Sequence, residues 1–186
     1  MLTINFHPFK NLVTERLLLR RITTDDAAAI LALRGDAETM KFIPRPLAKT
    51  LDDALEHIKM INDKIEENTG INWAITQKGH SELIGIIGHY RIQPENYRAE
   101  IGYMLLPDYH GKGIVTEAIR AAVAYGFEDM KLHSIEAVID TDNTASESVL
   151  IKNGFVKEAH ILENEFFDGK FWDTVIYSLL DRNFKR

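Results

Sequence analysis

The sequence predicts one mixed α/β domain over residues 1–186, of the α+β kind in which helices and strands alternate irregularly. Apolar residues recur at helical spacing in four segments and form β-rich runs in seven others, in the order βαα, βββ, αβα, ββ. No repeat, low-complexity segment or linker divides the chain, and its 186 residues and 21.2 kDa suit one domain with a substantial core.

The first third predicts a strand and two helices. The run 16–22 (RLLLRRI) is typical of a strand, and the threonine pair that follows, with two aspartates, opens a short helix over 23–34. Thr50, with Asp53 three residues later, is a capping signature for the second helix. Apolar residues at helical spacing continue that helix until Gly70 ends it.

In the middle third of the chain, the spacing of apolar residues changes from a helical to a strand-like period. Residues 72–77 and 82–92 are β-rich runs joined by a turn with the sequence Lys-Gly-His-Ser, and 98–106 is a third run. A helical pattern follows over 113–130. The change of period predicts three consecutive strands that lead into one long helix.

The last third predicts a strand over 134–139, a helix over 144–152 that stops at Asn-Gly, and a terminal hairpin. Strands over 155–162 and 171–180 form that hairpin. The Asp168-Gly169 pair between them favours a primed turn, whose central residues have positive φ.

Composition excludes several classes of function. The formal net charge of −6 argues against binding to nucleic acid phosphates and is compatible with a cationic substrate. No apolar run approaches the roughly 20 residues that cross a bilayer, and the first ten residues lack a signal-peptide core. We therefore expect a cytoplasmic protein with no membrane or nucleic-acid partner.

The absence of cysteine narrows the chemistry further. It excludes disulfides, thiolate metal sites and a covalent acyl-cysteine intermediate. The seven histidines are scattered, and none forms an i, i+4 pair beside a carboxylate. We therefore expect no metal.

The most informative segment is 105–118 (LLPDYHGKGIVTEA), where a strand, a glycine-rich turn and a helix follow one another. Such a turn directs free backbone N–H groups and the positive end of the helix dipole at one point, which favours a phosphate or pyrophosphate. The phosphate-loop pattern fails at Leu106, and the dinucleotide fingerprint fails at Thr116. A plain strand-to-helix turn is the alternative.

The same segment resembles motif A of the GNAT acetyltransferase superfamily, Q/R-x-x-G-x-G/A, placed on His110, Gly113 and Val115. A second segment, 143–155, resembles the family's N-x-x-S/A stretch with its Gly-Phe end. With the segments 14–20, 99–103 and 168–173, the chain resembles the branch of ribosomal-protein N-terminal acetyltransferases, from about residue 12 to 182. His110 stands in place of Gln or Arg, and Val115 in place of Gly or Ala.

The resemblance implies the GNAT fold and acetyl-coenzyme A as cosubstrate. The fold has a twisted, mostly antiparallel sheet of six to seven strands with about four helices, splayed between its fourth and fifth strands. It implies strand-like pairing of the pantetheine arm with 104–106, a pyrophosphate cradle over 110–116 and a contact from Asn143. The implied cofactor-binding residues are Met104, Leu105, Leu106, His110, Gly111, Lys112, Gly113, Ile114, Val115, Thr116 and Asn143. Val115 is bulky enough to crowd the phosphates, but we expect binding to survive.

Two residues are candidates for proton transfer. Glu100, on the strand before the glycine turn, is the candidate base; the alternative is a solvated carboxylate or a partner for Arg98. The family's usual tyrosine acid is replaced by Leu150, and the resemblance implies that Ser146 protonates or hydrogen-bonds the leaving thiolate. The alternative for Ser146 is a serine that satisfies backbone donors in the first helical turn. Ser148 is a weaker candidate for the same role.

The predicted function is transfer of acetyl to a primary amine by direct attack in a ternary complex, with a peptide or protein N-terminus as the default acceptor by resemblance. At pH 7, deprotonating a lysine-like amine costs about 4.6 kcal/mol and an α-amine only about 1 kcal/mol. Alternatives are a small-molecule amine, such as a polyamine, an aminoglycoside or an amino-acid-like compound, and a non-catalytic acetyl-coenzyme A sensor. Apolar strand faces near the C-terminus are compatible with a homodimer.

Overall fold

Eight strands form one open sheet in the computed structural model, which describes residues 1–185. The strand order is β1-β2-β3-β4-β5-β6-β8-β7, and of these neighbouring pairs only β5 and β6 run parallel. The strands are β1 (Leu12–Val13), β2 (Leu17–Arg20), β3 (Ile71–Gln77), β4 (Gly85–Gln93), β5 (Arg98–Leu105), β6 (Ser134–Asp140), β7 (Val156–Phe167) and β8 (Lys170–Leu180).

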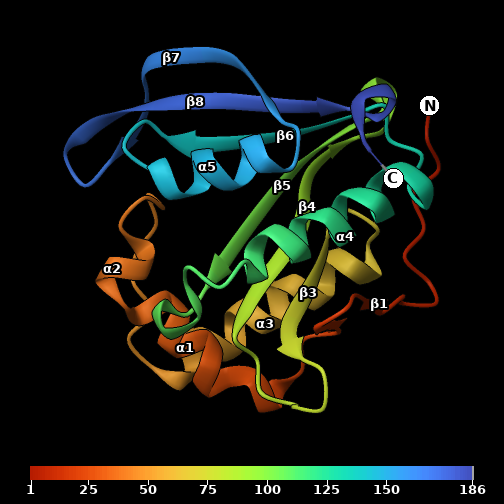
Figure 1. Ribbon diagram of the computed structural model, residues 1–186. Coiled ribbons are helices and arrows are strands. Elements are labelled where there is room, and N and C mark those ends of the chain that lie inside the picture. The colour runs from red at the N-terminus through yellow and green to blue at the C-terminus, as the bar shows by residue number, and fades with distance from the viewer. Residues whose placement is uncertain (186) are drawn as a thin grey trace.

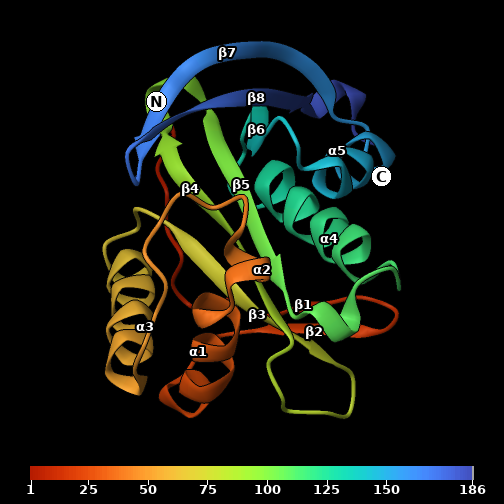
Figure 2. The ribbon, with the colours of Figure 1, turned by 90° about the vertical axis from the view of Figure 1, so that its left-hand side faces the viewer.

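Helices cover both faces of this sheet (Figures 1 and 2). One face carries the helices of the first third, and the other carries α4 and α5, which contact each other. The helices are α1 (Ala27–Gly35), α2 (Ala37–Met40), α3 (Leu51–Glu66), α4 (Ile114–Glu128) and α5 (Thr144–Lys152). Within residues 1–185, none of these helices combines the length and apolar character that crossing a membrane requires.

The capping signals act as the sequence predicts. Thr50 accepts a hydrogen bond from the Asp53 amide, and the Asp53 carboxylate accepts one from the Thr50 amide, so α3 begins with a complete capping box. Asp168 and Gly169 both have positive φ, which confirms the primed turn between β7 and β8.

The structure adds short elements to the predicted order. β1 is an eighth strand of two residues, and α2 is a fifth helix of four residues. Both are too short to produce a periodic signal in the sequence. β7 also runs five residues beyond the predicted end at Leu162, because Glu163 takes a positive φ at a bulge and lets the pairing with β8 continue.

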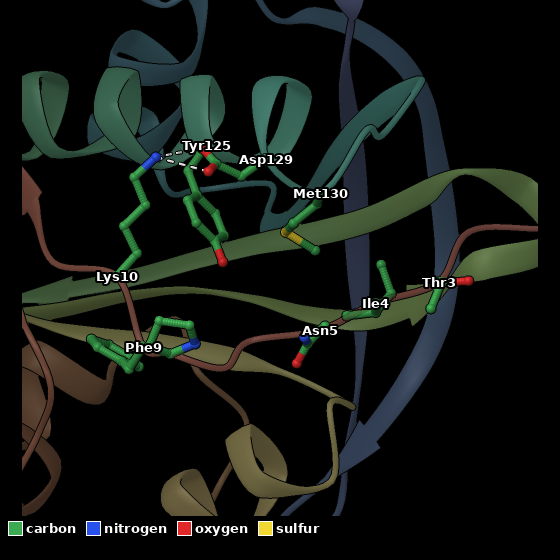
Figure 3. A pocket seen from close by; sticks show the side chains of 9 residues that line it. Thr3, Ile4, Asn5, Phe9, Lys10, Tyr125, Asp129 and Met130 are labelled. Carbon is green, nitrogen blue, oxygen red and sulfur yellow. Dashed lines mark hydrogen bonds and ion pairs between the residues drawn. The ribbon is translucent and has the colours of Figure 1, made fainter.

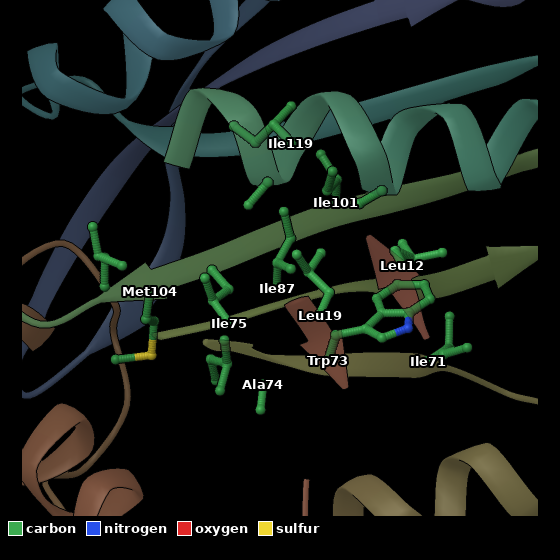
Figure 4. Packing of buried hydrophobic residues seen from close by; sticks show 14 of the residues in the cluster. Leu12, Leu19, Ile71, Trp73, Ala74, Ile75, Ile87, Ile101, Met104 and Ile119 are labelled. Carbon is green, nitrogen blue, oxygen red and sulfur yellow. The ribbon is translucent and has the colours of Figure 1, made fainter. Parts of the chain in front are cut away.

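The core fills the space between the sheet and its helices (Figure 4). Trp73 is fully buried at its centre, packs edge-on against Tyr125, and donates its indole N–H to the Lys10 carbonyl. The helical stripe on α3, which includes Ile58 and Ile61, is buried as predicted. Both faces of the sheet are therefore packed against helices. The geometry of the candidate site depends on the place where two neighbouring strands of the sheet separate.

Candidate active site

The sheet opens between β5 and β6. These parallel strands pair at only three positions, from Arg98 opposite Ser134 to Glu100 opposite Glu136. β5 nevertheless continues to Leu105 against β4, and β6 continues to Asp140 against β8. The second halves of β5 and β6 therefore diverge, as Figure 1 shows, and this splay is the one that the resemblance implies between the fourth and fifth predicted strands.

Backbone direction along β5 decides which groups line this gap. The Leu106 amide donates to the Ile84 carbonyl beside β4. Because bonded positions alternate in an antiparallel pair, the backbone groups of Met104 also face β4, whereas those of Tyr103 and Leu105 face the gap. The Leu105 carbonyl is already bonded to the His110 ring, with Nε2 at 2.9 Å. Of the backbone groups predicted to pair with a ligand over 104–106, only the Leu105 amide therefore faces the gap with no partner given by these contacts; those of Met104 and the Leu106 amide are directed at β4. Tyr103, one residue before the predicted range, also directs its backbone groups at the gap.

The start of α4 presents a row of unpaired amides. Gly111 and Gly113 have φ values of 72° and 73°, a conformation that glycine adopts without strain. No acceptor within residues 1–185 bonds the amides from Gly111 to Thr116, and the first amide bonded back along the chain is that of Glu117, to the Gly113 carbonyl. Together with the helix dipole, these amides have the geometry that suits an anion such as a diphosphate.

Side chains from the first strands hold this loop in place. Arg16 donates to the Lys112 carbonyl and forms an ion pair with Glu117, whose carboxylate also accepts from the Thr14 hydroxyl. Val115, a departure from the family pattern, packs its side chain against the hydrophobic core. Its bulk is therefore accommodated by the core beneath the loop.

Glu100 lies at the last paired position before the gap. Its side chain is mostly buried and forms an ion pair of 2.9 Å with Arg91, not with Arg98, which pairs instead with Glu136. Arg91 reaches it because a bulge with positive φ turns that side chain toward Glu100. Burial raises the pKa of Glu100 above its ordinary value. The attraction of Arg91 opposes this shift, and repulsion from Glu136 adds to it.

Tyr103 and Ser146 meet on the opposite face of β5. Alternation along the strand places Tyr103 away from Glu100, on the side covered by α4 and α5. The Tyr103 hydroxyl is buried and has no hydrogen bond of regular geometry among the described residues, yet the Ser146 side chain interacts with it. Burial raises the pKa of Tyr103 to about 12, and Ser146 opposes that shift.

Asn143 fixes the position of Ser146. Its side-chain oxygen accepts from the Ser146 amide at 3.1 Å and caps α5. The Ser146 hydroxyl itself forms no hydrogen bond with the backbone of residues 1–185. The alternative interpretation, in which this hydroxyl satisfies backbone donors of the first helical turn, therefore does not match its contacts. Ser148 is exposed on the same helix.

Tyr103 is not among the site residues that the sequence predicts, although its hydroxyl is buried beside Ser146. Nothing in the local sequence pattern distinguishes Tyr103 from other strand tyrosines. Its distinguishing feature is the contact with Ser146 of α5, which arises only in the folded chain. His89 of β4 is fully buried in the core, and its ring is bonded to the Ala122 carbonyl. Burial lowers the pKa of His89 to about 4.

A cavity of about 510 Å³ lies between the N-terminal segment and the C-terminal end of α4, away from the glycine turn (Figure 3). Its two charged groups, Lys10 and Asp129, are bonded to each other at 2.7 Å. The described residues contain no group of three or more histidines or carboxylates that could hold a metal ion.

Comparison with known proteins identifies the family. Residues 16–156 match the model of the acetyltransferase (GNAT) domain. The chain is 36% identical over 172 residues to the uncharacterized N-acetyltransferase YoaA of Bacillus subtilis, covering 92% of this chain and 97% of that protein. It superimposes on a GNAT acetyltransferase from Bacillus anthracis with a TM-score of 0.82 at 29% identity, covering 93% and 99% of the two chains. The chain belongs to the GNAT family of N-acetyltransferases and depends on acetyl-coenzyme A.

Its relatives act on different acceptors. The ribosomal-protein-serine acetyltransferase of Escherichia coli is 34% identical over 97 residues, 52% of this chain and 54% of that protein. The spermidine N(1)-acetyltransferase of Vibrio cholerae is 24% identical over 162 residues, 87% and 91% of the two chains. Membership of the family therefore establishes an amine acetyltransferase and leaves the acceptor class to be inferred from the site.

Proposed function

We propose that the protein acetylates an α-amino group, such as a peptide or protein N-terminus, by direct attack on the thioester in a ternary complex. The observation that carries this proposal is Glu100, a mostly buried carboxylate with a raised pKa at the mouth of the splay. A base of this kind suits an α-amine, whose ordinary pKa of about 7.8 requires little driving force for deprotonation. The absence of cysteine supports direct transfer.

Acetyl-coenzyme A supplies the activated acetyl group when it is bound. The unpaired amides from Gly111 to Thr116 are suited to hold its diphosphate, and Tyr103 and the Leu105 amide to receive its pantetheine arm. Asn143 uses its side-chain oxygen to cap α5, which leaves its NH₂ group as the donor for a cofactor contact.

The proposed base and the proposed hydrogen-bond donors lie on opposite faces of β5. Glu100 accepts a proton from the amine on the α1–α3 face, directly or through a water. On the α4–α5 face, the Ser146 and Tyr103 hydroxyls donate hydrogen bonds to the developing thiolate. A tyrosine pKa of about 12 is far above the roughly 8.5 of a thiol, so Tyr103 acts as a donor that keeps its proton.

A polyamine acceptor is the second candidate, favoured by the named activity of the spermidine relative. The two candidates differ in the amine that must be deprotonated and in the charge of the rest of the acceptor. The homodimer and the cytoplasmic location remain predictions.

Thiol release from acetyl-coenzyme A, measured across N-terminal peptides, polyamines and aminoglycosides, tests the proposal. We expect release with peptides and about a 10²-fold lower kcat/KM in Glu100→Gln, with acetyl-coenzyme A affinity preserved. Glu136→Gln, its cross-strand neighbour, is the matched control and retains most activity because Glu136 is held by Arg98. Unchanged turnover in Glu100→Gln contradicts the role of Glu100, and release with polyamines alone contradicts the α-amine.

A further inference from the structure

One partly buried arginine lacks an acidic partner. Four arginines within residues 1–185 are partly buried, namely Arg20, Arg21, Arg34 and Arg98. Arg20 pairs with Asp26, Arg21 with Glu66 and Arg98 with Glu136. The Arg34 guanidinium forms no hydrogen bond or ion pair with any described residue.

No acidic residue within 1–185 forms an ion pair with Arg34 or contributes to its pKa shift. Arg34 lies near the end of α1, on the sheet face that also carries Glu100, and it interacts electrostatically with Tyr90 and Arg45. His57 of α3 lies nearby, where burial and the charge of Arg34 lower its pKa to about 4 and keep it neutral at pH 7. Burying a cation without a counter-ion is unfavourable, so this environment favours binding of an anion.

Tyr90 supplies a second donor at the same place. Its phenol ring lies over Gly102, where an added Cβ would be 3.0 Å from the ring. The Asn72 amide crosses Gly88 and donates to the Tyr90 oxygen. Because that oxygen accepts from Asn72, the Tyr90 O–H proton is free to be donated. Burial raises the pKa of Tyr90 to about 12, which keeps that proton in place.

The donors lie beside the candidate base. Tyr90 is the cross-strand partner of Glu100, and such partners have Cβ atoms about 5 Å apart. Glu165 of β7 adds a second negative charge near Glu100. Arg91 offsets the charge of Glu100, and the added charge of Glu165 leaves this end of the face negative and suited to an ammonium group, whereas Arg34 makes the other end positive.

We propose that Arg34 and Tyr90 bind a carboxylate of the acceptor, so that the acceptor carries an acidic group close to its reacting amine. This inference rests on the proposed function and narrows its substrate class. The acceptor is an amino acid or a peptide with an acidic residue near its N-terminus, and a polyamine, which is cationic throughout, is excluded.

Binding measured without turnover tests this inference. The full chain, saturated with coenzyme A, is titrated by calorimetry with two matched pairs and with spermidine. One pair is the tetrapeptide amides Ser-Asp-Ala-Ala and Ser-Asn-Ala-Ala, and the other is serine and serinamide. We expect the acidic member of one pair to bind roughly tenfold or more tightly than its neutral partner, since charged hydrogen bonds contribute about 1.5–3 kcal/mol. The pair that discriminates shows which source supplies the carboxylate.

Variants assign the effect to Arg34. Arg34→Gln removes the preference for the acidic member, Arg34→Lys keeps part of it, and Arg182→Gln, an exposed arginine on the C-terminal turn, leaves it unchanged. Equal binding within both pairs, tighter binding of spermidine, or a preference that survives Arg34→Gln overturns the inference. Carboxylate-dependent binding without any thiol release contradicts the proposed function and supports the anion site.

Discussion

At the residue scale, the site depends on hydroxyls and a carboxylate whose burial changes their proton affinity. Tyr103 keeps its proton because burial disfavours the phenolate, and Ser146 lies beside it with a hydroxyl that the helix cap leaves free. Neither group is an effective acid in water. In a gap that excludes solvent, however, two fixed donors stabilise developing negative charge more strongly than water does.

Removing these hydroxyls should slow the chemical step. We expect Ser146→Ala and Tyr103→Phe each to lower kcat about tenfold or more with little change in KM for acetyl-coenzyme A, because the donors act on the leaving thiolate. Steady-state thiol release measures both constants. Ser148→Ala, which removes an exposed hydroxyl from the same helix, serves as the control. A rise in KM with an unchanged kcat would contradict the assignment.

The proposed role of Glu100 predicts how activity depends on pH. Glu100 must be deprotonated to accept a proton, so activity falls as pH drops through its pKa, which burial raises above the ordinary glutamate value. We expect the acidic limb of the kcat/KM profile to lie above that ordinary value and to disappear in Glu100→Gln. An acidic limb that is identical in Glu100→Gln would assign it to another group.

At the element scale, the cofactor loop depends on how α4 begins. Gly113 is the N-terminal cap and has a positive φ, which turns the preceding amides toward one point. An added Cβ there meets only the Arg16 guanidinium, at 3.5 Å, so a side chain fits but the backbone is strained. Conformation is therefore the reason for glycine at this position.

Gly113→Ala should weaken cofactor binding and stability together. A left-handed conformation costs an alanine about 1–2 kcal/mol, and relief of that strain misaligns the amides. Gly169→Ala is the matched control, because Gly169 has a φ of 77° in the hairpin turn with nothing near its Cβ. We expect both variants to lower the melting temperature and only Gly113→Ala to raise the Kd for acetyl-coenzyme A. Equal affinity in the two variants would contradict the cradle.

At the scale of the whole molecule, two layers of helices bury polar groups as well as apolar ones. Burial lowers the pKa of both His57 and His89 to about 4. In the unfolded chain these groups have pKa values near 6.5, so between about pH 6.5 and 4 the unfolded state binds more protons. The contribution of the two neutral histidines to the free energy of unfolding is therefore fully present above this window, and it is lost as pH falls through the window.

This linkage predicts how unfolding responds to acid. We expect the free energy of urea unfolding to decrease from pH 7 to pH 4.5, and His57→Gln to reduce the slope by up to one proton, or about 1.4 kcal/mol per pH unit. His80→Gln, in the exposed turn before β4, is the control for the replacement of a histidine by glutamine. A slope unaffected by His57→Gln would show that His57 does not remain neutral in the fold.

The order of the elements, the glycine turn and the family can be predicted from the sequence, because they depend on local signals. Helical and strand periods are written in consecutive residues, and the conformations of Gly113 and Asp168-Gly169 follow from side chains that are absent or small. Glu100, Ser146 and Asn143 are predicted site residues because of the motifs in which they stand, and these assignments stay predictions.

Which of these residues contact one another depends on the three-dimensional fold. The partner of Glu100 is Arg91, which a bulge redirects, and not the nearer-seeming Arg98. Tyr103 meets Ser146 of α5, more than forty residues away in the chain, and Arg34 differs from the other partly buried arginines because no acid within residues 1–185 pairs with it. Burial and partnership arise from long-range packing, and these determine pKa and charge compensation, so no local pattern contains them.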